Sequence, residues 1–253
     1  MSIRTAVDHG IATIEIARPE RKNALTQAMY GALADALAAA DADPEVRAVL
    51  VIGQPGMFTA GNDLEEFMQR ATGDDGAATR RFMGALAGCG KPVVAAVTGA
   101  AVGIGTTMLL HCDLVVVSDD ARLAMPFVSL GLVPEFASSL LFPQRVGHVK
   151  AVEHLLLGEP MSGRQAVELG LANAVVPAAE VVEHARRLAR RFNALPPGAV
   201  RDSKALMRRA RQALVEDTIA AEGAVFAQRL HSPEAMQAFQ AFFQKRARPV
   251  PTP

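Results

Sequence analysis

Two glycine-centred segments and one glutamate carry the residue types that can do chemistry in this chain. The first segment spans residues 57–64 and the second spans residues 99–113. Each follows an apolar, β-rich run, and glycine allows a sharp turn in which backbone N–H groups face a ligand. Two such turns can direct two N–H groups at one carbonyl oxygen, which makes an oxyanion hole.

The glutamate is Glu135, an acid in the otherwise apolar stretch 130–137. A single carboxyl group beside an oxyanion hole indicates an enolate-forming site with one base. A structural interpretation competes with this one, because Glu135 stands just before a helical run, where an acid stabilises the helix dipole. The two roles are compatible.

The surrounding pattern predicts an α/β core that positions these segments. Residues 3–7 and 11–16 flank His9-Gly10 and predict a β-hairpin. Thr26 is expected to cap a helix that ends near Asp43. Further strands are expected at 46–52, 92–98 and 113–118, and a helix over 65–88 that a loop at 72–76 interrupts. Strands alternating with helices indicate a mainly parallel or mixed sheet.

The remainder of the chain is mostly helical in pattern. A helix is expected from about Gly103, and from Ser139 helices dominate, with one short strand near 174–176. After the Pro-Pro-Gly run at 196–198, three helices are predicted, the last from Ser232. We therefore divide the chain into an α/β core, 1–195, and a helical C-terminal region, 196–253.

Composition narrows the function classes. The formal net charge is zero, which argues against nucleic acid or an acidic membrane surface as partner. Residues 1–179 hold 13 Lys and Arg against 19 Asp and Glu, whereas residues 180–253 hold 13 against 7. The basic C-terminal part either serves an anionic ligand or pairs with the acidic remainder, and we favour pairing.

Other features point to a soluble protein. Two cysteines exclude a disulfide framework, the histidines lack metal-ligand spacing, and no metal is expected. The N-terminus does not resemble a signal peptide, and the longest apolar stretches contain glycines typical of buried α/β core. A cytoplasmic protein that does not enter membranes is expected.

Five motifs in order resemble the crotonase (enoyl-CoA hydratase/isomerase) superfamily across nearly the whole chain. They lie at residues 18–25, 58–64, 99–113, 162–172 and 232–246. The resemblance implies a spiral of ββα turns with a helical C-terminal trimerisation region, as a homotrimer or a dimer of trimers. It also implies an acyl-CoA thioester substrate, with coenzyme A as part of the substrate and no separate cofactor.

The resemblance assigns the two oxyanion amides to Asn62 and Ile104. Backbone N–H groups would do this work, so the side chains are free to vary. The alternative is that both segments are merely tight turns that contain glycine.

The acid–base residues decide between reactions of the superfamily. Its hydratases use two glutamates, and the matching positions here hold Thr107 and Phe127. Residues 126–135 instead resemble the Δ3,Δ2-enoyl-CoA isomerase branch, especially its peroxisomal type, whose single catalytic glutamate matches Glu135. This base would move a proton from C2 to C4 of a 3-enoyl thioester, aided by an apolar setting from Phe127 and Phe136.

Two alternatives to isomerisation stay open. The first is a hydratase, or another reaction through a thioester enolate, that uses Thr107 or a water molecule. The second is a catalytically silent subunit that binds acyl-CoA.

The resemblance also suggests which residues bind coenzyme A. These are Lys22, Ala24, Ala60 and Asp63, together with Lys245, which would reach the phosphates, often from a neighbouring subunit. Asp63 has a second interpretation, in which its side chain only fixes the turn. Many relatives carry a lysine after the residues that match Asp63-Leu64, whereas this chain has Glu65-Glu66. This difference weakens the argument that phosphate groups bind here.

Overall fold

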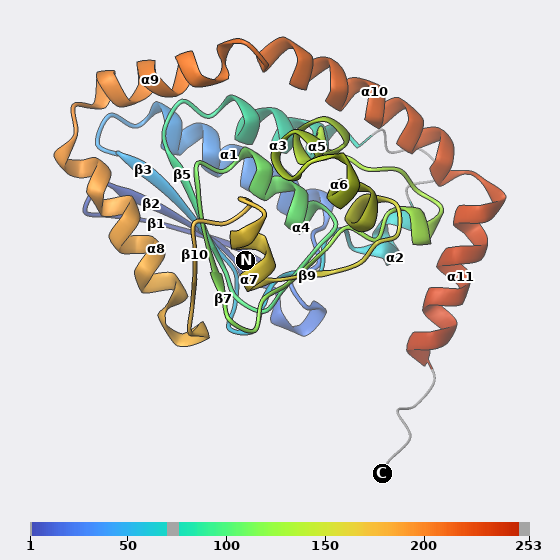
Figure 1. Ribbon diagram of the computed structural model, residues 1–253. Coiled ribbons are helices and arrows are strands. Elements are labelled where there is room, and N and C mark those ends of the chain that lie inside the picture. Colours follow the sequence, from blue (N-terminus) through green and yellow to red (C-terminus); the bar gives the residue numbers. More distant parts are fainter. Residues whose placement is uncertain (1, 70–75, 248–253) are drawn as a thin grey trace.

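The computed structural model describes residues 2–69 and 76–247 as an α/β fold with two sheets. Helices α9 to α11 form an arc over the outside of the body in Figure 1. Within the described ranges, no helix is both long and apolar enough to cross a bilayer.

The larger sheet has six strands in the order β1-β2-β3-β5-β7-β10. Their bounds are β1 (Ile3–Asp8), β2 (Ile11–Ile16), β3 (Ala48–Ile52), β5 (Val93–Val97), β7 (Leu114–Ser118) and β10 (Ala174–Val176). The first two strands form the predicted antiparallel hairpin, and the other neighbours pair in parallel. All five residues of β5 are buried, as expected for a parallel strand with helices on both faces.

Helices cover the two faces of this sheet separately. Helix α8 (Val181–Arg190) packs on one face, where Val94 and Ala96 point toward it. Helices α1 (Gln27–Ala42) and α3 (Ala77–Gly88) cover the other face. The predicted cap of α1 is present, because the Thr26 hydroxyl accepts a hydrogen bond from the Met29 amide at 3.3 Å.

A second, four-stranded sheet was not predicted from the sequence. It contains β4 (Met57–Thr59), β6 (Ala100–Val102), β8 (Arg122–Ala124) and β9 (Met161–Ser162), in that order. Strands of two or three residues are too short to show an alternating pattern, so the sequence revealed only the glycine turns after them. Because β4 and β6 pair in parallel, their carboxyl ends place the two glycine segments next to each other.

The remaining helices largely follow the predicted order. Their bounds are α2 (Leu64–Gln69), α4 (Ile104–Thr107), α5 (Ser138–Val146), α6 (His148–Leu155), α7 (Gly163–Glu168), α9 (Pro197–Arg209), α10 (Gln212–Leu230) and α11 (Pro233–Ala247). Helix α4 continues as a 3-10 helix, Met108–His111. Of the expected loop at 72–76, only Gly76 lies within the described residues.

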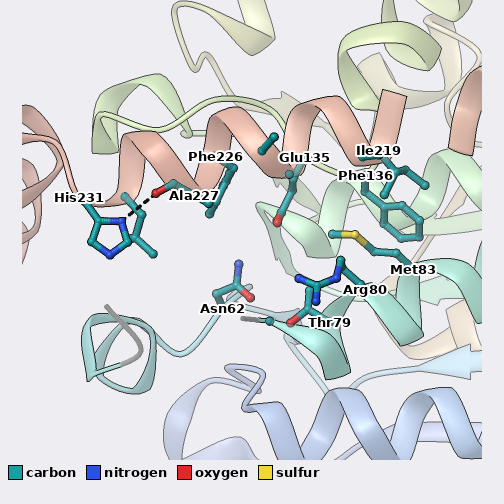
Figure 2. A pocket seen from close by; sticks show the side chains of 15 residues that line it. Asn62, Thr79, Arg80, Met83, Glu135, Phe136, Ile219, Phe226, Ala227 and His231 are labelled. Carbon is teal, nitrogen blue, oxygen red and sulfur yellow. Dashed lines mark hydrogen bonds between the residues drawn. The ribbon is translucent and has the colours of Figure 1, made fainter. Parts of the chain in front are cut away.

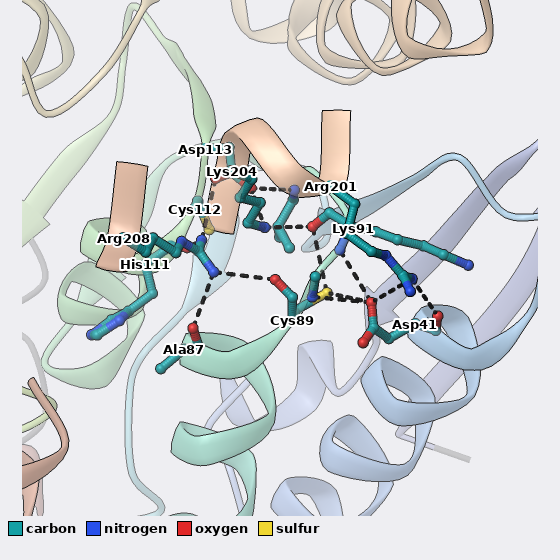
Figure 3. Close-up of polar contacts among 12 residues, drawn as sticks. Asp41, Ala87, Cys89, Lys91, His111, Cys112, Asp113, Arg201, Lys204 and Arg208 are labelled. Carbon is teal, nitrogen blue, oxygen red and sulfur yellow. Dashed lines mark hydrogen bonds and ion pairs between the residues drawn. The ribbon is translucent and has the colours of Figure 1, made fainter. Parts of the chain in front are cut away.

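A polar cluster fastens α9 to the α/β core (Figure 3). The ammonium group of Lys204, which is 7% exposed, lies 2.6 Å from the Asp113 carboxylate, and Arg208 lies 3.2 Å from the other carboxylate oxygen. Burial lowers the pKa of Lys204, and the charge of Asp113 opposes that shift. These contacts favour pairing with the acidic core as the role of the basic C-terminal part.

Candidate active site

The two glycine turns touch each other, backbone against backbone. Gly61 has a φ of +83°, and a Cβ there would lie 2.6 Å from the Val102 carbonyl oxygen. A Cβ on Gly105 would lie 2.5 Å from Cγ2 of Thr59. Any side chain at these positions would force the turns apart, which explains why both are glycine.

Gly61 and Asp63, on either side of Asn62, are hydrogen-bonded to Leu25, but the amide of Asn62 is not. Leu25 donates to the Gly61 carbonyl at 2.8 Å and accepts from the Asp63 amide at 2.9 Å, so the residues on each side of Asn62 are paired. Ile104 is the first residue of α4, where an N–H has no acceptor within the helix. In the part of the chain that the structure describes, neither amide has a hydrogen-bond acceptor.

Tyr30 supports the first turn from α1, and the sequence did not single it out. Its fully buried hydroxyl donates to Oδ1 of Asn62 at 2.5 Å. Its ring packs against Phe82 of α3, with ring centroids 5.5 Å apart. The spacing within α1 predicts an inward position for Tyr30, but only the fold shows that Asn62 is its partner.

Glu135 lies in a turn between the 3-10 helix Val128–Leu130 and α5, and it is 6% exposed. The next two residues, Phe136 and Ala137, have φ values of +62° and +54°. Left-handed backbone costs a residue with a Cβ on the order of 1 kcal/mol. Two such residues in succession persist only where surrounding contacts hold them.

Glu135 and Asn62 face the same cavity of about 490 Å³ (Figure 2). Its walls come mainly from α3, α10 and the Glu135 turn, and they are mostly apolar: Met83, Phe136, Ile219, Phe226, Ala227 and Leu230. Thr79 and Arg80 add polar groups from α3. Such a space fits an acyl chain next to one carboxyl group.

Ile104 is placed differently from the other two predicted catalytic residues. Its side chain is fully buried in the core, and it does not line the cavity that Asn62 and Glu135 share. The residue before it, Gly103, lies against the first turn, because a Cβ on Gly61 would be 3.9 Å from the Gly103 Cα.

The two positions that carry glutamates in hydratases offer no carboxylate here. Thr107 is fully buried, and among the described residues its hydroxyl has no hydrogen-bond partner. Phe127 is 5% exposed and stands beside the second turn, with a ring carbon 3.8 Å from the Cβ position of Gly103.

Three of the predicted coenzyme A residues lie together at the first turn. The Ala60 amide donates to the Lys22 carbonyl at 3.0 Å, and the Ala24 amide donates to Arg21 at 3.0 Å. Lys22 is exposed and has a left-handed φ of +53°. Asp63 lies in the same turn, where Arg18 donates to both its carboxylate and the Ala24 carbonyl oxygen, whereas Lys245 lies in α11.

The contacts of Asp63 favour the interpretation that it fixes the turn. One oxygen lies 2.7 Å from the guanidinium of Arg18, and the other accepts from the Glu65 amide at 3.1 Å. Burial works to raise the pKa of Asp63, but the hydrogen bond from Arg18 helps to lower it overall. Lys245 falls in α11, and its side chain lies outside the described part of the structure.

No group of three potential metal ligands occurs within residues 2–69 and 76–247. Among the residues described above, the amides of Asn62 and Ile104 can donate hydrogen bonds to an oxygen, and the carboxyl group of Glu135 can transfer a proton.

Comparison with known proteins adds independent findings. The family model described as Enoyl-CoA hydratase/isomerase matches residues 6–250. A Bacillus subtilis protein named "Probable enoyl-CoA hydratase" is 31% identical over 97% of this chain and 96% of its own. Rat "Enoyl-CoA delta isomerase 2" is 34% identical over 94% of this chain and 62% of its own length.

The solved structure of Pseudomonas aeruginosa OdaA superimposes with a TM-score of 0.92. It is 51% identical and covers 95% of this chain and 98% of its own. These matches confirm the predicted resemblance and the predicted α/β fold. Trimerisation through the helical region and the boundary at residue 195 stay predictions.

Proposed function

The chain belongs to the enoyl-CoA hydratase/isomerase family, and within it we propose a Δ3,Δ2-enoyl-CoA isomerase with Glu135 as its single base. One observation carries this proposal. Glu135 is a buried carboxyl group on an apolar cavity that it shares with Asn62, whereas the hydratase positions hold Thr107 and Phe127. Hydration needs groups that hold and activate water, but a shift of a double bond needs only one base.

The proposed reaction moves one proton within the substrate. The thioester oxygen accepts hydrogen bonds from the amides of Asn62 and Ile104, and Glu135 removes a proton from C2. The resulting dienolate places its negative charge on the bound oxygen, where the two N–H groups stabilise it. Glu135 then returns the proton to C4, so the double bond moves from C3–C4 to C2–C3 and the carboxylate is regenerated.

Coenzyme A would lie outside the cavity, along the first turn. Lys22, Ala24 and Ala60 are the proposed contacts there, and the exposed side chain of Lys22 offers the positive charge. Lys245 is proposed to reach the phosphates of a bound acyl-CoA from a neighbouring subunit of a homotrimer or a dimer of trimers. Asp63 serves this site indirectly, because its carboxylate holds Arg18 and the start of α2.

Hydration of a 2-enoyl-CoA is the second candidate. It is favoured by the Bacillus subtilis relative, which is named a probable hydratase and matches this chain over nearly its whole length. Against it stands the absence of a carboxyl group at positions 107 and 127.

A paired assay on the purified protein separates these functions. 3-Hexenoyl-CoA and 2-hexenoyl-CoA are offered separately, and the products are identified by mass and absorbance. The proposal requires conversion of the first compound to its 2-enoyl isomer while the second stays unhydrated. Faster hydration of the second compound would establish the hydratase, and tight binding without turnover of either would favour a silent acyl-CoA-binding subunit.

A further inference from the structure

The turn that carries Glu135 needs support from outside itself. Phe136 and Ala137 both adopt left-handed backbone, which residues with a Cβ avoid unless neighbours impose it. The orientation of Glu135 depends on this backbone, since a small rotation at Phe136 would redirect the preceding carboxyl group. The groups that contact Phe136 therefore help to determine where the Glu135 carboxyl group points.

His111 contacts both the backbone and the ring of Phe136. Its Nε2 lies 2.8 Å from the Phe136 carbonyl oxygen, and its ring stacks on the Phe136 ring at 3.9 Å with an 18° tilt. Burial lowers the pKa of His111 to about 4, so the ring is neutral near pH 7. Because a carbonyl oxygen only accepts, the neutral ring donates from Nε2.

His111 is itself held on a rigid segment. It ends the 3-10 helix Met108–His111, which continues directly from α4 and thus from Ile104. Its carbonyl oxygen accepts a hydrogen bond from Arg208 of α9 at 3.1 Å. One continuous segment therefore carries the second proposed oxyanion amide at its start and the support of the Glu135 turn at its end.

Glu222 of α10 fixes the far side of the same turn. Its carboxylate accepts from the Ala137 amide at 2.6 Å and from the Ser139 amide at 2.9 Å. The Phe136 carbonyl and the Ala137 amide belong to one planar peptide group, so His111 and Glu222 hold that group from its two ends, one at the oxygen and the other at the N–H.

We propose that His111 is a positioning residue for Glu135, which uses the hydrogen bond to the Phe136 carbonyl to keep the carboxyl group aimed into the cavity. This inference rests on the proposed role of Glu135 as the base. It assigns to His111 no contact with the substrate.

Two variants at position 111 test this role. His111→Phe keeps an aromatic ring for the stack but removes the donor, whereas His111→Gln places an amide N–H near the position of Nε2. We expect His111→Phe to lower kcat about 10- to 100-fold with KM within about twofold, because a misaligned base affects turnover more than binding. His111→Gln should recover most of kcat. Should His111→Phe fail to fold, His111→Asn replaces it, because its shorter side chain does not reach the Phe136 carbonyl.

His154 offers a matched control. It is also a buried histidine, its Nδ1 lies 2.7 Å from the Glu159 carbonyl oxygen, and its ring meets that of Phe142 edge-on at 6.0 Å. His154→Phe removes the same kind of contact away from Glu135, and kcat should stay within about twofold of the wild-type value.

The outcomes separate this inference from the function on which it rests. Equal losses of kcat in His111→Phe and His154→Phe, or no recovery in His111→Gln, would overturn the positioning role. Glu135→Gln is measured alongside. If that variant is inactive while His111→Phe keeps wild-type kcat, only the positioning role is wrong. If Glu135→Gln keeps its turnover, the proposed function is wrong, and the positioning role falls with it.

Discussion

The first glycine turn and the Glu135 turn line the same cavity, but they are held in different ways. The first turn is shaped by glycine, since the backbone of Gly61 lies against Val102 and no side chain fits between them. The Glu135 turn has left-handed backbone at Phe136 and Ala137, a conformation that glycine adopts at lower cost. It is held instead by the side chains of His111 and Glu222, which lie 25 and 85 residues away from their partners in the chain.

This difference determines what each turn contributes to the chemistry. Backbone amides at fixed turns can stabilise charge on an oxygen whatever the neighbouring side chains are. A proton can be moved only by a titratable side chain, whose aim depends on the residues packed around it. A change in the first region should therefore act through backbone shape, and a change in the second through single side chains.

The largest effect should come from Glu135→Gln. Glutamine keeps the shape of the side chain but cannot take a proton, so kcat with 3-hexenoyl-CoA should fall by about 1,000-fold or more. Binding of hexanoyl-CoA, measured by calorimetry, should be unchanged. Glu168→Gln changes an exposed glutamate of α7 and serves as the control. If Glu135→Gln lowers kcat by less than tenfold, Glu135 is not the base, and the Glu135 turn does not supply the proton-transferring group.

The next largest effect should come from Gly61→Ala. The added Cβ would lie 2.6 Å from the Val102 carbonyl oxygen and must displace the backbone that carries the Asn62 amide. Loss of one oxyanion donor lowers kcat by about 100- to 1,000-fold. The measurement is kcat at saturating substrate, together with thermal unfolding to show that the variant is folded.

Gly170→Ala separates this clash from backbone strain. Gly170 has a similar φ of +74°, but a Cβ there would meet no atom within 4 Å. It should therefore lose some stability, through its φ alone, without losing turnover. Equal kcat values for Gly61→Ala and Gly170→Ala would show that the contact between the glycine turns does not matter for catalysis.

The difference between local turns and long-range side-chain contacts also explains how much of the site could be predicted from the sequence. The glycine turns, the hairpin, the Thr26 cap and the three C-terminal helices follow from local residue types, and the structure contains each of them. Glu135 could be singled out because it is an acid in an apolar stretch. These signals lie within a few residues of the feature they specify.

The supporting residues gave no comparable signal. No motif in the sequence marks His111, because its partner Phe136 lies 25 residues away and only the fold brings the two together. Tyr30 and Glu222 act on Asn62 and Ala137 through contacts that the fold alone creates. The small second sheet was missed for a related reason, because its strands are stabilised by pairing with each other and not by a pattern of their own.

The smallest expected effect is a decrease in the free energy of unfolding in acid, caused by the buried His111 that supports the Glu135 turn. Burial, with lesser contributions from the charges of Arg208, Arg211 and Arg145, lowers the pKa of His111 from 6.5 to about 4. Between these values the unfolded chain binds a proton that the folded chain does not, so the free energy of unfolding falls as the pH drops from 6.5 toward 4. From about pH 7.5 to pH 5, this one group should remove about 2 kcal/mol.

Urea unfolding of the wild-type protein and of His111→Phe at both pH values isolates the contribution of His111. Carboxyl groups titrate in both proteins, so only the difference between the two losses counts, and it should be about 2 kcal/mol larger in the wild type. His154→Phe leaves His111 in place and should keep the wild-type loss. Parallel losses in all three proteins would mean that His111 is not buried between the core and the Glu135 turn as its contacts with Phe136 require. The Glu135 turn would then be held by Glu222 alone. The contrast between a first turn shaped by glycine and a Glu135 turn held by distant side chains would be correspondingly weaker.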